Sequence, residues 1–408
     1  MRYPMVFLLV IALSSVSLAQ GWMEGPPMIE PRRDAAVAVL DGDVYVIGGA
    51  DNGGTLLGTV ERLGDGGAWT PVASLRDARY LAAAAVYEGR IVLMGGNEDG
   101  GEATDDVEVY VPAEDDWESF QHLDQARQGL GAVVMKGKLY ALGGATETGT
   151  LLTTCEYYEA NLDQWYAYTN WVVDPRRAGF GIVAVGDVAY LAGGFGPFGP
   201  LNLVERYTVE GGTEILSPMT QARGKLALTT DGQALYAIGG IGADNEALDL
   251  VERYDFERAV WETIAPLNTP RIAATAAYAD GMIYVAGGID DEGQVVNSVE
   301  VLAASVGVEA EDMPSSAGFE FSAGYPNPFT EATDFMLRLE APARLSIQVY
   351  DVRGKRVATL LEGEVPAGVH SVNWNGRAGD GRRLPSGVYV VRLAGSRVLA
   401  NARVTLIR

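Results

Sequence analysis

The 408-residue sequence is poor in cysteine, histidine and lysine. Its single cysteine, Cys155, excludes an intramolecular disulfide, and one cysteine with His122 and His370 cannot supply a Cys/His zinc set. The chain also lacks a nucleophile elbow, a phosphate-binding loop and a dinucleotide-binding fingerprint. We therefore expect no metal and no other cofactor, and we assign no catalytic residue.

Positive charge is scarce as well. Four of the 30 basic residues are lysines, and 54 acidic residues bring the net charge to −24. Because binding to phosphates requires a positive surface, no nucleic-acid partner is expected. The acidity is typical of a surface that keeps a protein dispersed in salt, and a cationic or metal-bridged ligand is the alternative.

Long apolar runs are also missing. The run Met5 to Leu13 is too short to span a bilayer, and no other stretch approaches the roughly 18 apolar residues that a span requires. Arg2 precedes this run, and Ser17 and Ala19 follow it in the spacing of a cleavage site. Residues 1–19 are therefore predicted to be a signal peptide, and the protein is expected to be secreted or displayed at the cell surface, without a membrane span.

The charge distribution divides the rest of the chain. Residues 313–408 carry 8 acidic and 12 basic side chains, which leaves a net charge of −29 on residues 20–312. The composition changes in a stretch rich in Ala, Ser, Glu and Pro. We predict a first domain at residues 20–302, a linker at residues 303–318 and a second domain at residues 319–408.

A repeat sets the fold of the first domain. Glycine doublets recur at spacings of 47, 48, 50, 46 and 48 residues. The six doublets begin at Gly48, Gly95, Gly143, Gly193, Gly239 and Gly287. Six near-equal units of this length indicate a repeat architecture.

Each unit has further fixed positions around its doublet. A turn glycine lies six or seven residues before it and a tyrosine usually lies three before it, as Gly42 and Tyr45 do in the first unit. A Val-Glu pair such as Val60-Glu61 follows, and four of the six units then carry a tryptophan such as Trp69. The pattern predicts four short strands per unit and no helix.

The two ends of the repeat fit each other. The sixth unit ends without a tryptophan strand, whereas Trp22 lies 26 residues before Gly48, the interval that separates Trp69 from Gly95. A ring closed by this N-terminal strand would hide the edges of its sheets. The ordered motif resembles the kelch repeat over residues 22–302, and this resemblance implies an all-β, six-bladed kelch β-propeller.

Two charged positions also repeat. An arginine lies 16 residues before each doublet, at Arg32, Arg79, Arg127, Arg177, Arg223 and Arg271. A glutamate follows each doublet, at Glu61, Glu108, Glu156, Glu205, Glu252 and Glu300. Ion pairing between the two sets is the favoured interpretation, and ligand binding by the six arginines is the alternative.

Strand parity places the arginines at one end of the blades, together with the longest insertions. Four aromatic residues lie in these insertions: Tyr168, Trp171, Phe195 and Phe198. Aromatic faces beside guanidinium groups are typical of sites for sugars or carboxylates. We predict that a protein or carbohydrate ligand binds on this loop face, with packing of an irregular blade as the equal alternative. The acidic, glycine-rich loops, such as residues 97–101, are interpreted as solvated turns rather than calcium sites.

The second domain has a different pattern. Alternating segments such as residues 335–339, 345–350 and 387–393 predict about seven short strands of an Ig-like β-sandwich. The run Tyr325-Pro326-Asn327-Pro328-Phe329 and the later Ser386-Gly387-Val388-Tyr389 resemble the C-terminal type IX secretion sorting domain. Asn373-Trp374-Asn375-Gly376 resembles the related Ig-like module of flagellar hook-capping proteins. The resemblance implies a secretion machinery as partner, and a plain spacer is the alternative.

These features together favour an exported binding protein over an enzyme. The alternative is a sugar mutarotase or epimerase that acts on a carboxylate-bearing sugar, similar to the exported sialic-acid epimerases with six kelch blades. In such an enzyme a glutamate would shuttle the proton, so an abnormal pKa at one repeated glutamate would favour it. A purely architectural surface protein is a third possibility.

Overall fold

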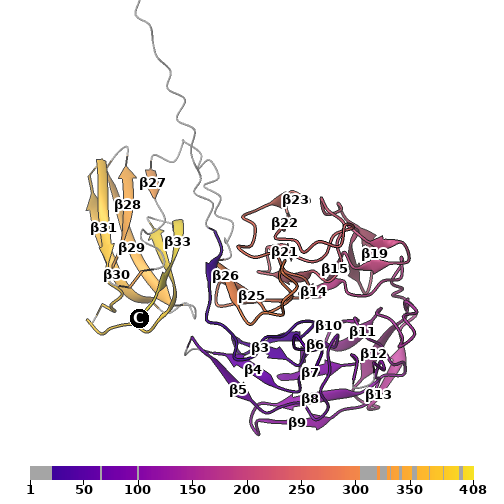
Figure 1. Cartoon of the computed structure of the whole chain (residues 1–408). Helices are drawn as coiled ribbons and strands as arrows, with labels where there is room; N and C mark the ends of the chain where they lie inside the picture. The colour runs from indigo at the N-terminus through magenta and orange to yellow at the C-terminus, as the bar shows by residue number, and fades with distance from the viewer. Residues whose placement is uncertain are drawn as a thin grey trace, which may run out of the picture. The chain divides into compact units, whose positions relative to one another are not determined.

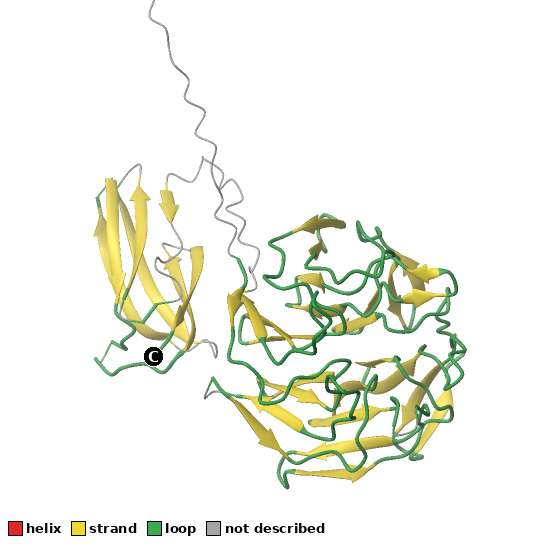
Figure 2. Ribbon diagram, viewed as in Figure 1, coloured by secondary structure: helices red, strands yellow, loops and turns green. Residues whose placement is uncertain are grey.

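The computed structural model describes residues 21–64, 67–98, 101–303, 319–321, 329–330, 332–339, 342–351, 356–366, 368–379, 381–394 and 398–408. These residues form strands, turns and loops, as Figure 2 shows, and none of them belongs to a helix that could cross a membrane. Two compact units comprise Met1–Ala304 and Ser305–Arg408. The predicted signal peptide and residues 304–318 of the predicted linker lie outside the described residues.

The described part of the first unit holds six four-stranded antiparallel sheets, which we call blades one to six. Blade one is β2 (Ala36–Leu40), β3 (Asp43–Ile47), β4 (Val60–Leu63) and β5 (Trp69–Val72). Blade two is β6 (Ala83–Tyr87), β7 (Arg90–Met94), β8 (Val107–Val111) and β9 (Asp116–Ser119). Blade three is β10 (Gly131–Met135), β11 (Lys138–Leu142), β12 (Cys155–Glu159) and β13 (Gln164–Ala167).

The second half of the unit repeats this order with one addition. Blade four is β14 (Gly181–Val185), β15 (Val188–Ala192), β18 (Val204–Thr208) and β19 (Gly212–Ile215), with a hairpin of β16 (Phe195–Gly196) and β17 (Gly199–Pro200) inserted after β15. Blade five is β20 (Ala227–Thr230), β21 (Ala234–Ile238), β22 (Val251–Asp255) and β23 (Val260–Thr263). Blade six is β24 (Thr275–Ala279), β25 (Met282–Ala286), β26 (Val299–Ala303) and β1 (Met23–Glu24).

The sixth blade draws its outermost strand from the start of the described chain. Met23 of β1 pairs with Val301 of β26, and in Figure 1 the indigo start of the described chain runs beside orange β26. The first strand of each blade contacts the first strand of the next, and β24 of blade six contacts β2 of blade one. The circuit of contacts therefore returns to its start, which fits a propeller.

The core of this unit lies between neighbouring blades. Tyr45 and Ile47 of blade one pack with Leu93 and Tyr110 of blade two, and the two tyrosine rings lie 5.7 Å apart. Burying one such large apolar side chain contributes roughly 1.5–3 kcal/mol. Because each blade has an apolar face toward both neighbours, no blade buries its surface alone.

The second unit is a separate two-layer module. One sheet has the order β27 (Phe319–Phe321), β28 (Thr333–Leu339) and β31 (Gly368–Trp374). The other has the order β30 (Arg356–Val365), β29 (Ala343–Asp351), β32 (Gly387–Ala394) and β33 (Val398–Leu406). In β28 buried and exposed residues alternate, and its Phe335 joins Ile347 and Trp374 in one core, as expected of an Ig-like sandwich.

Candidate functional site

The repeated arginines and glutamates meet inside the blades. The arginine side chains are at most 1% exposed, and each forms an ion pair with the glutamate of its own blade. The nitrogen–oxygen distance is 2.7 Å for Arg32–Glu61, 2.6 Å for Arg79–Glu108, 2.6 Å for Arg223–Glu252 and 3.2 Å for Arg271–Glu300. Arg127–Glu156 and Arg177–Glu205 complete the set. The ion pairing that the sequence favoured is thus present in all six blades. Because the arginine side chains are buried, they expose no group that could bind a ligand.

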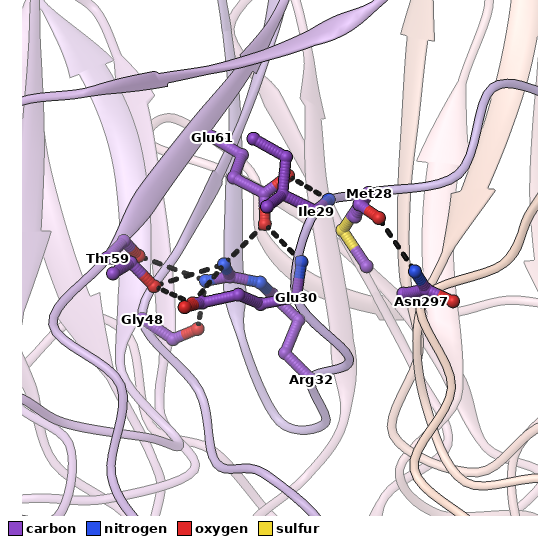
Figure 3. A network of polar contacts seen from close by, with 8 residues as sticks. All are labelled: Met28, Ile29, Glu30, Arg32, Gly48, Thr59, Glu61 and Asn297. Carbon is purple, nitrogen blue, oxygen red and sulfur yellow. Dashed lines mark hydrogen bonds and ion pairs between the residues drawn. The ribbon is translucent and has the colours of Figure 1, made fainter.

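Blade one shows what each pair holds together (Figure 3). Arg32 Nη1 donates to the carbonyl oxygens of Gly48 at 2.8 Å and Thr59 at 3.0 Å, while Nη2 donates to Glu61. The Glu61 carboxylate also accepts the backbone N–H of Ile29 at 2.6 Å. The pair therefore fastens the link that enters the blade to the loop between its second and third strands. The charge-assisted hydrogen bonds hold the two segments together, although Arg32 Nε has no partner among the described residues.

The glycine doublets join one blade to the next. The N–H of Gly49 donates to the carbonyl oxygen of Arg79 in blade two at 2.9 Å, and the N–H of Gly288 donates to that of Arg32 at 2.8 Å. Gly48 has a φ of +62°, and a Cβ there would lie 2.5 Å from the Arg79 carbonyl oxygen. Glycine is required because the neighbouring backbone occupies the space of a side chain.

Blade four departs from this scheme. In blade one the glutamate also accepts the N–H of Glu30, two residues before the repeated arginine, at 3.0 Å. The corresponding residue before blade four is Pro175, which has no N–H to donate. Burial raises the pKa of the Glu205 carboxyl, against the attraction of Arg177, and burial lowers the pKa of Arg177.

The same link supplies the aromatic residue that blade four lacks on its outermost strand, where Thr213 takes the place of tryptophan. Trp171 is 2% exposed and stacks on Tyr207, with ring centroids 4.2 Å apart and planes at 5°. Of the two interpretations of Trp171, packing of an irregular blade fits its position, because a buried ring offers no face to a ligand. Tyr168 is half-buried, and its hydroxyl oxygen accepts the Tyr207 hydroxyl at 3.1 Å.

The last two predicted residues, Phe195 and Phe198, both lie in the inserted hairpin of blade four but differ in burial. Phe195 is half-buried and covers Gly224, where a Cβ would lie 2.2 Å from the phenyl ring. Phe198 lies between β16 and β17 and is fully exposed, at 104% of its reference area. Among the predicted aromatic residues, Phe198 alone presents its whole ring to solvent.

The first strands of the blades surround a ring that the sequence did not predict. Six residues, each two positions after a repeated arginine, donate their N–H groups around a closed circuit at 2.8–3.0 Å. The circuit runs through Asp34, Leu81, Gly129, Gly179, Lys225 and Ala273. All six have a positive φ, between 47° and 61°.

One ion pair crosses the cavity that this ring lines. The cavity has a volume of about 130 Å³. Lys225 Nζ lies 2.8 Å from Asp34 Oδ1, and Arg33 Nη1 donates to Asp34 Oδ2 at 2.6 Å. The Asp34 carboxylate therefore lies between two cationic groups, and the three residues together carry one net positive charge. The separation of Asp34 and Lys225 by 191 residues explains why no local sequence pattern shows the pair.

Groups suited to metal or nucleophilic chemistry are few among the described residues. Asp105, Asp106 and His122 place ligand atoms within 4.8 Å of one another, but the three side chains are 33–55% exposed, as in an ordinary surface ion pair. Cys155 is buried, and burial raises the pKa of its thiol, which disfavours the thiolate.

Comparison with known proteins identifies two kinds of region. Residues 31–76, 78–122, 222–268 and 270–302 match the Kelch motif, and residues 327–397 match the FlgD Ig-like domain. Kelch repeats imply a protein-binding propeller. The prediction of kelch repeats followed by an Ig-like module of the hook-capping kind is confirmed.

Individual relatives share only parts of the chain. Kelch-like protein 33 of Homo sapiens is 40% identical over 86 residues, which cover 21% of this chain and 16% of that protein. The basal-body rod modification protein FlgD of Salmonella typhimurium is 30% identical over 105 residues, which cover 26% of this chain and 45% of that protein. The chain thus spans less than half the length of these curated relatives. The structure of YjhT is similar with a TM-score of 0.62 and 16% identity, over 69% of this chain and 98% of that chain, and it supports the fold alone.

Proposed function

We propose that this chain is an exported kelch-repeat protein whose first unit, a closed six-bladed propeller, binds another protein through its loop face. The loop face is the end of the blades that carries the loops between second and third strands and the links between blades. The burial of all six repeated arginines carries this proposal. Since the repeated charges stabilise the blades, we assign recognition to residues outside the repeat. Phe198 on this face is the most exposed of the large hydrophobic residues that the structure describes.

A non-catalytic role agrees with the state of the repeated glutamates. Of the six, Glu205 has a raised pKa, which is the property expected of a proton-shuttling residue. Its carboxylate is, however, 6% exposed and held by Arg177. The sugar epimerase remains the alternative, and loss of an epimerase activity in Glu205→Gln would favour it.

Delivery outside the cell is the second part of the proposal. The signal peptide at residues 1–19 would direct export, and the C-terminal module would act as a sorting domain for a type IX secretion machinery. Deletion of residues 319–408 tests the sorting role in a host that has this machinery. We expect the protein to be retained in the periplasm, and undiminished release would contradict sorting.

The binding role is tested by affinity capture with the full chain. Phe198→Asp is compared with Leu162→Asp, because Leu162 is also exposed, at 61%, but lies in the β12–β13 turn at the opposite end of the blades. We expect the same protein to be recovered with the native chain and with Leu162→Asp, and to be lost with Phe198→Asp. Equal recovery with both variants would refute binding through the loop face.

A further inference from the structure

Lys225 brings a surplus positive charge into the cavity that the ring of first strands lines, which we call the ring cavity. Four of the six ring residues carry no charge: Leu81, Gly129, Gly179 and Ala273. The other two, Asp34 and Lys225, pair at 2.8 Å, although Arg33 already pairs with the same carboxylate at 2.6 Å. Because Arg33 alone balances the charge of Asp34, Lys225 is not needed for that purpose. One positive charge is left over in a partly buried place, where a charge is costly to keep.

The Lys225 ammonium group can be reached by a ligand. Its side chain lines the ring cavity of about 130 Å³ and is 32% exposed, whereas the Asp34 side chain is 2% exposed. Nζ contacts both Asp34 oxygens, at 2.8 Å and 3.1 Å, and an ammonium group has a third N–H beyond these two contacts. The backbone N–H groups of the ring residues are already bonded around the circuit. Lys225 is thus the donor that the ring offers to a ligand.

The rest of the lining is apolar. Its larger side chains are Leu81, which is half-buried, and Leu130, Phe180 and Leu226, which keep 6–7% of their area exposed. Contact with these side chains removes carbon atoms of a ligand from water, which is favourable. The ring cavity therefore combines one cationic group with an apolar edge.

The charges select the class of ligand. A cation would be repelled by Lys225 and would not reach the buried Asp34 carboxylate. A phosphate or sulfate group is bound best by several converging donors, whereas the ring offers one. A single carboxylate can accept the available N–H of Lys225, and it brings the summed charge of Arg33, Asp34, Lys225 and the ligand to zero.

We propose that the ring cavity binds one carboxylate group on a short apolar chain, with the carboxylate on Lys225 and the chain against Leu81. This site goes beyond the protein-binding role and does not depend on it, because Phe198 does not line the ring cavity. A small free acid and an acidic side chain of a bound protein are the two sources that share this chemistry.

The test is calorimetric titration of the full chain with sodium acetate, propionate and butyrate, and with butyramide and butylammonium chloride as neutral and cationic probes. We expect saturable binding that tightens from acetate to butyrate, and no binding of the other two probes. Lys225→Met keeps the length of the side chain and leaves Asp34 paired with Arg33, so this variant should fold. It should bind butyrate at least about tenfold more weakly than the native chain.

Lys136→Met is the matched control. Lys136 is also partly exposed, also has a positive φ, and lies in the turn between β10 and β11, away from the lining of the ring cavity. Its removal should leave butyrate binding unchanged.

Asp34→Asn separates binding from a purely structural role of the ion pair. The φ of 51° at this position suits asparagine, and loss of the carboxylate raises the net charge that faces the ligand. Butyrate should therefore bind more tightly to Asp34→Asn, whereas a purely structural pair would only lose stability. The proposal is overturned if no carboxylate saturates the native chain, if Lys225→Met binds butyrate as tightly as the native chain, or if Asp34→Asn binds it more weakly.

The affinity capture described above distinguishes the two sources of the carboxylate. Loss of the captured protein with Lys225→Met would assign the carboxylate to that protein, and its full recovery would assign the site to a free acid. The butyrate titration needs no protein partner, so failure of this site and failure of binding through Phe198 are separate results.

Discussion

In blade two, Trp117 reaches from the outermost strand to Tyr110, and their ring centroids lie 5.3 Å apart. In blade four the partner of the corresponding tyrosine, Tyr207, is Trp171 from the link that precedes the blade, at 4.2 Å. The contact is kept although the residue that makes it comes from another part of the chain. A repeat of this kind thus preserves an interaction rather than a residue at a fixed position.

The buried carboxylates differ between the same two blades. Glu108 of blade two accepts the N–H groups of Arg76 at 2.9 Å and Asp77 at 3.4 Å in addition to its arginine. Before blade four Pro175 stands at the position of Asp77, and burial raises the pKa of Glu205. Blade four therefore keeps the ion pair with less support for the negative charge, and protonation of Glu205 would remove the attraction between the two side chains.

Of the changes that test this comparison between blades, removal of one repeated arginine should have the largest effect on stability. Arg127→Met leaves Glu156 buried without its counter-charge, and we expect a loss of about 3–5 kcal/mol in the free energy of unfolding. Arg177→Met should cost less at mildly acidic pH, because Glu205 takes up a proton more readily. Urea unfolding followed by tryptophan fluorescence measures both variants, and an equal loss at every pH would remove the distinction between the blades.

The pH dependence of Glu205→Gln should be a smaller effect. A carboxyl whose pKa is raised in the folded state binds its proton more tightly there, so ionised Glu205 costs stability above its folded pKa. This cost disappears as the pH falls toward the ordinary glutamate pKa. The native chain should therefore gain stability relative to Glu205→Gln as the pH is lowered through that window. Parallel stability curves, recorded by urea unfolding at a series of pH values, would show that Glu205 carries no such cost.

The repeat explains how much of this could be predicted. The fixed interval between each arginine and its doublet made pairing with the glutamates predictable, because every copy occupies the same place in its blade. Trp171 has no counterpart in the repeat, so only the structure distinguishes a packing ring from a binding ring. The polar side chain of Asn97 at an apolar repeat position can be seen in the sequence, but only the structure shows that its Oδ1 is buried without a partner among the described residues.

The smallest effect on stability is expected at the surface. Phe198→Ala removes a ring that packs against little, so the free energy of unfolding should change by less than about 0.5 kcal/mol. The same variant should weaken binding of the protein partner. Weaker binding with unchanged stability would show that Phe198 belongs to the proposed recognition surface and does not stabilise blade four. A large loss of stability, measured by thermal unfolding, would instead show that Phe198 stabilises the fold of blade four.

The assignment of blade four is tested most directly by urea unfolding of Trp171→Ala beside Trp117→Ala. Both tryptophans are buried and pack on a tyrosine of the third strand, so each variant should lose about 3–5 kcal/mol in the free energy of unfolding. A loss below about 0.5 kcal/mol for Trp171→Ala, with the full loss for Trp117→Ala, would contradict the account and return Trp171 to the ligand-binding face.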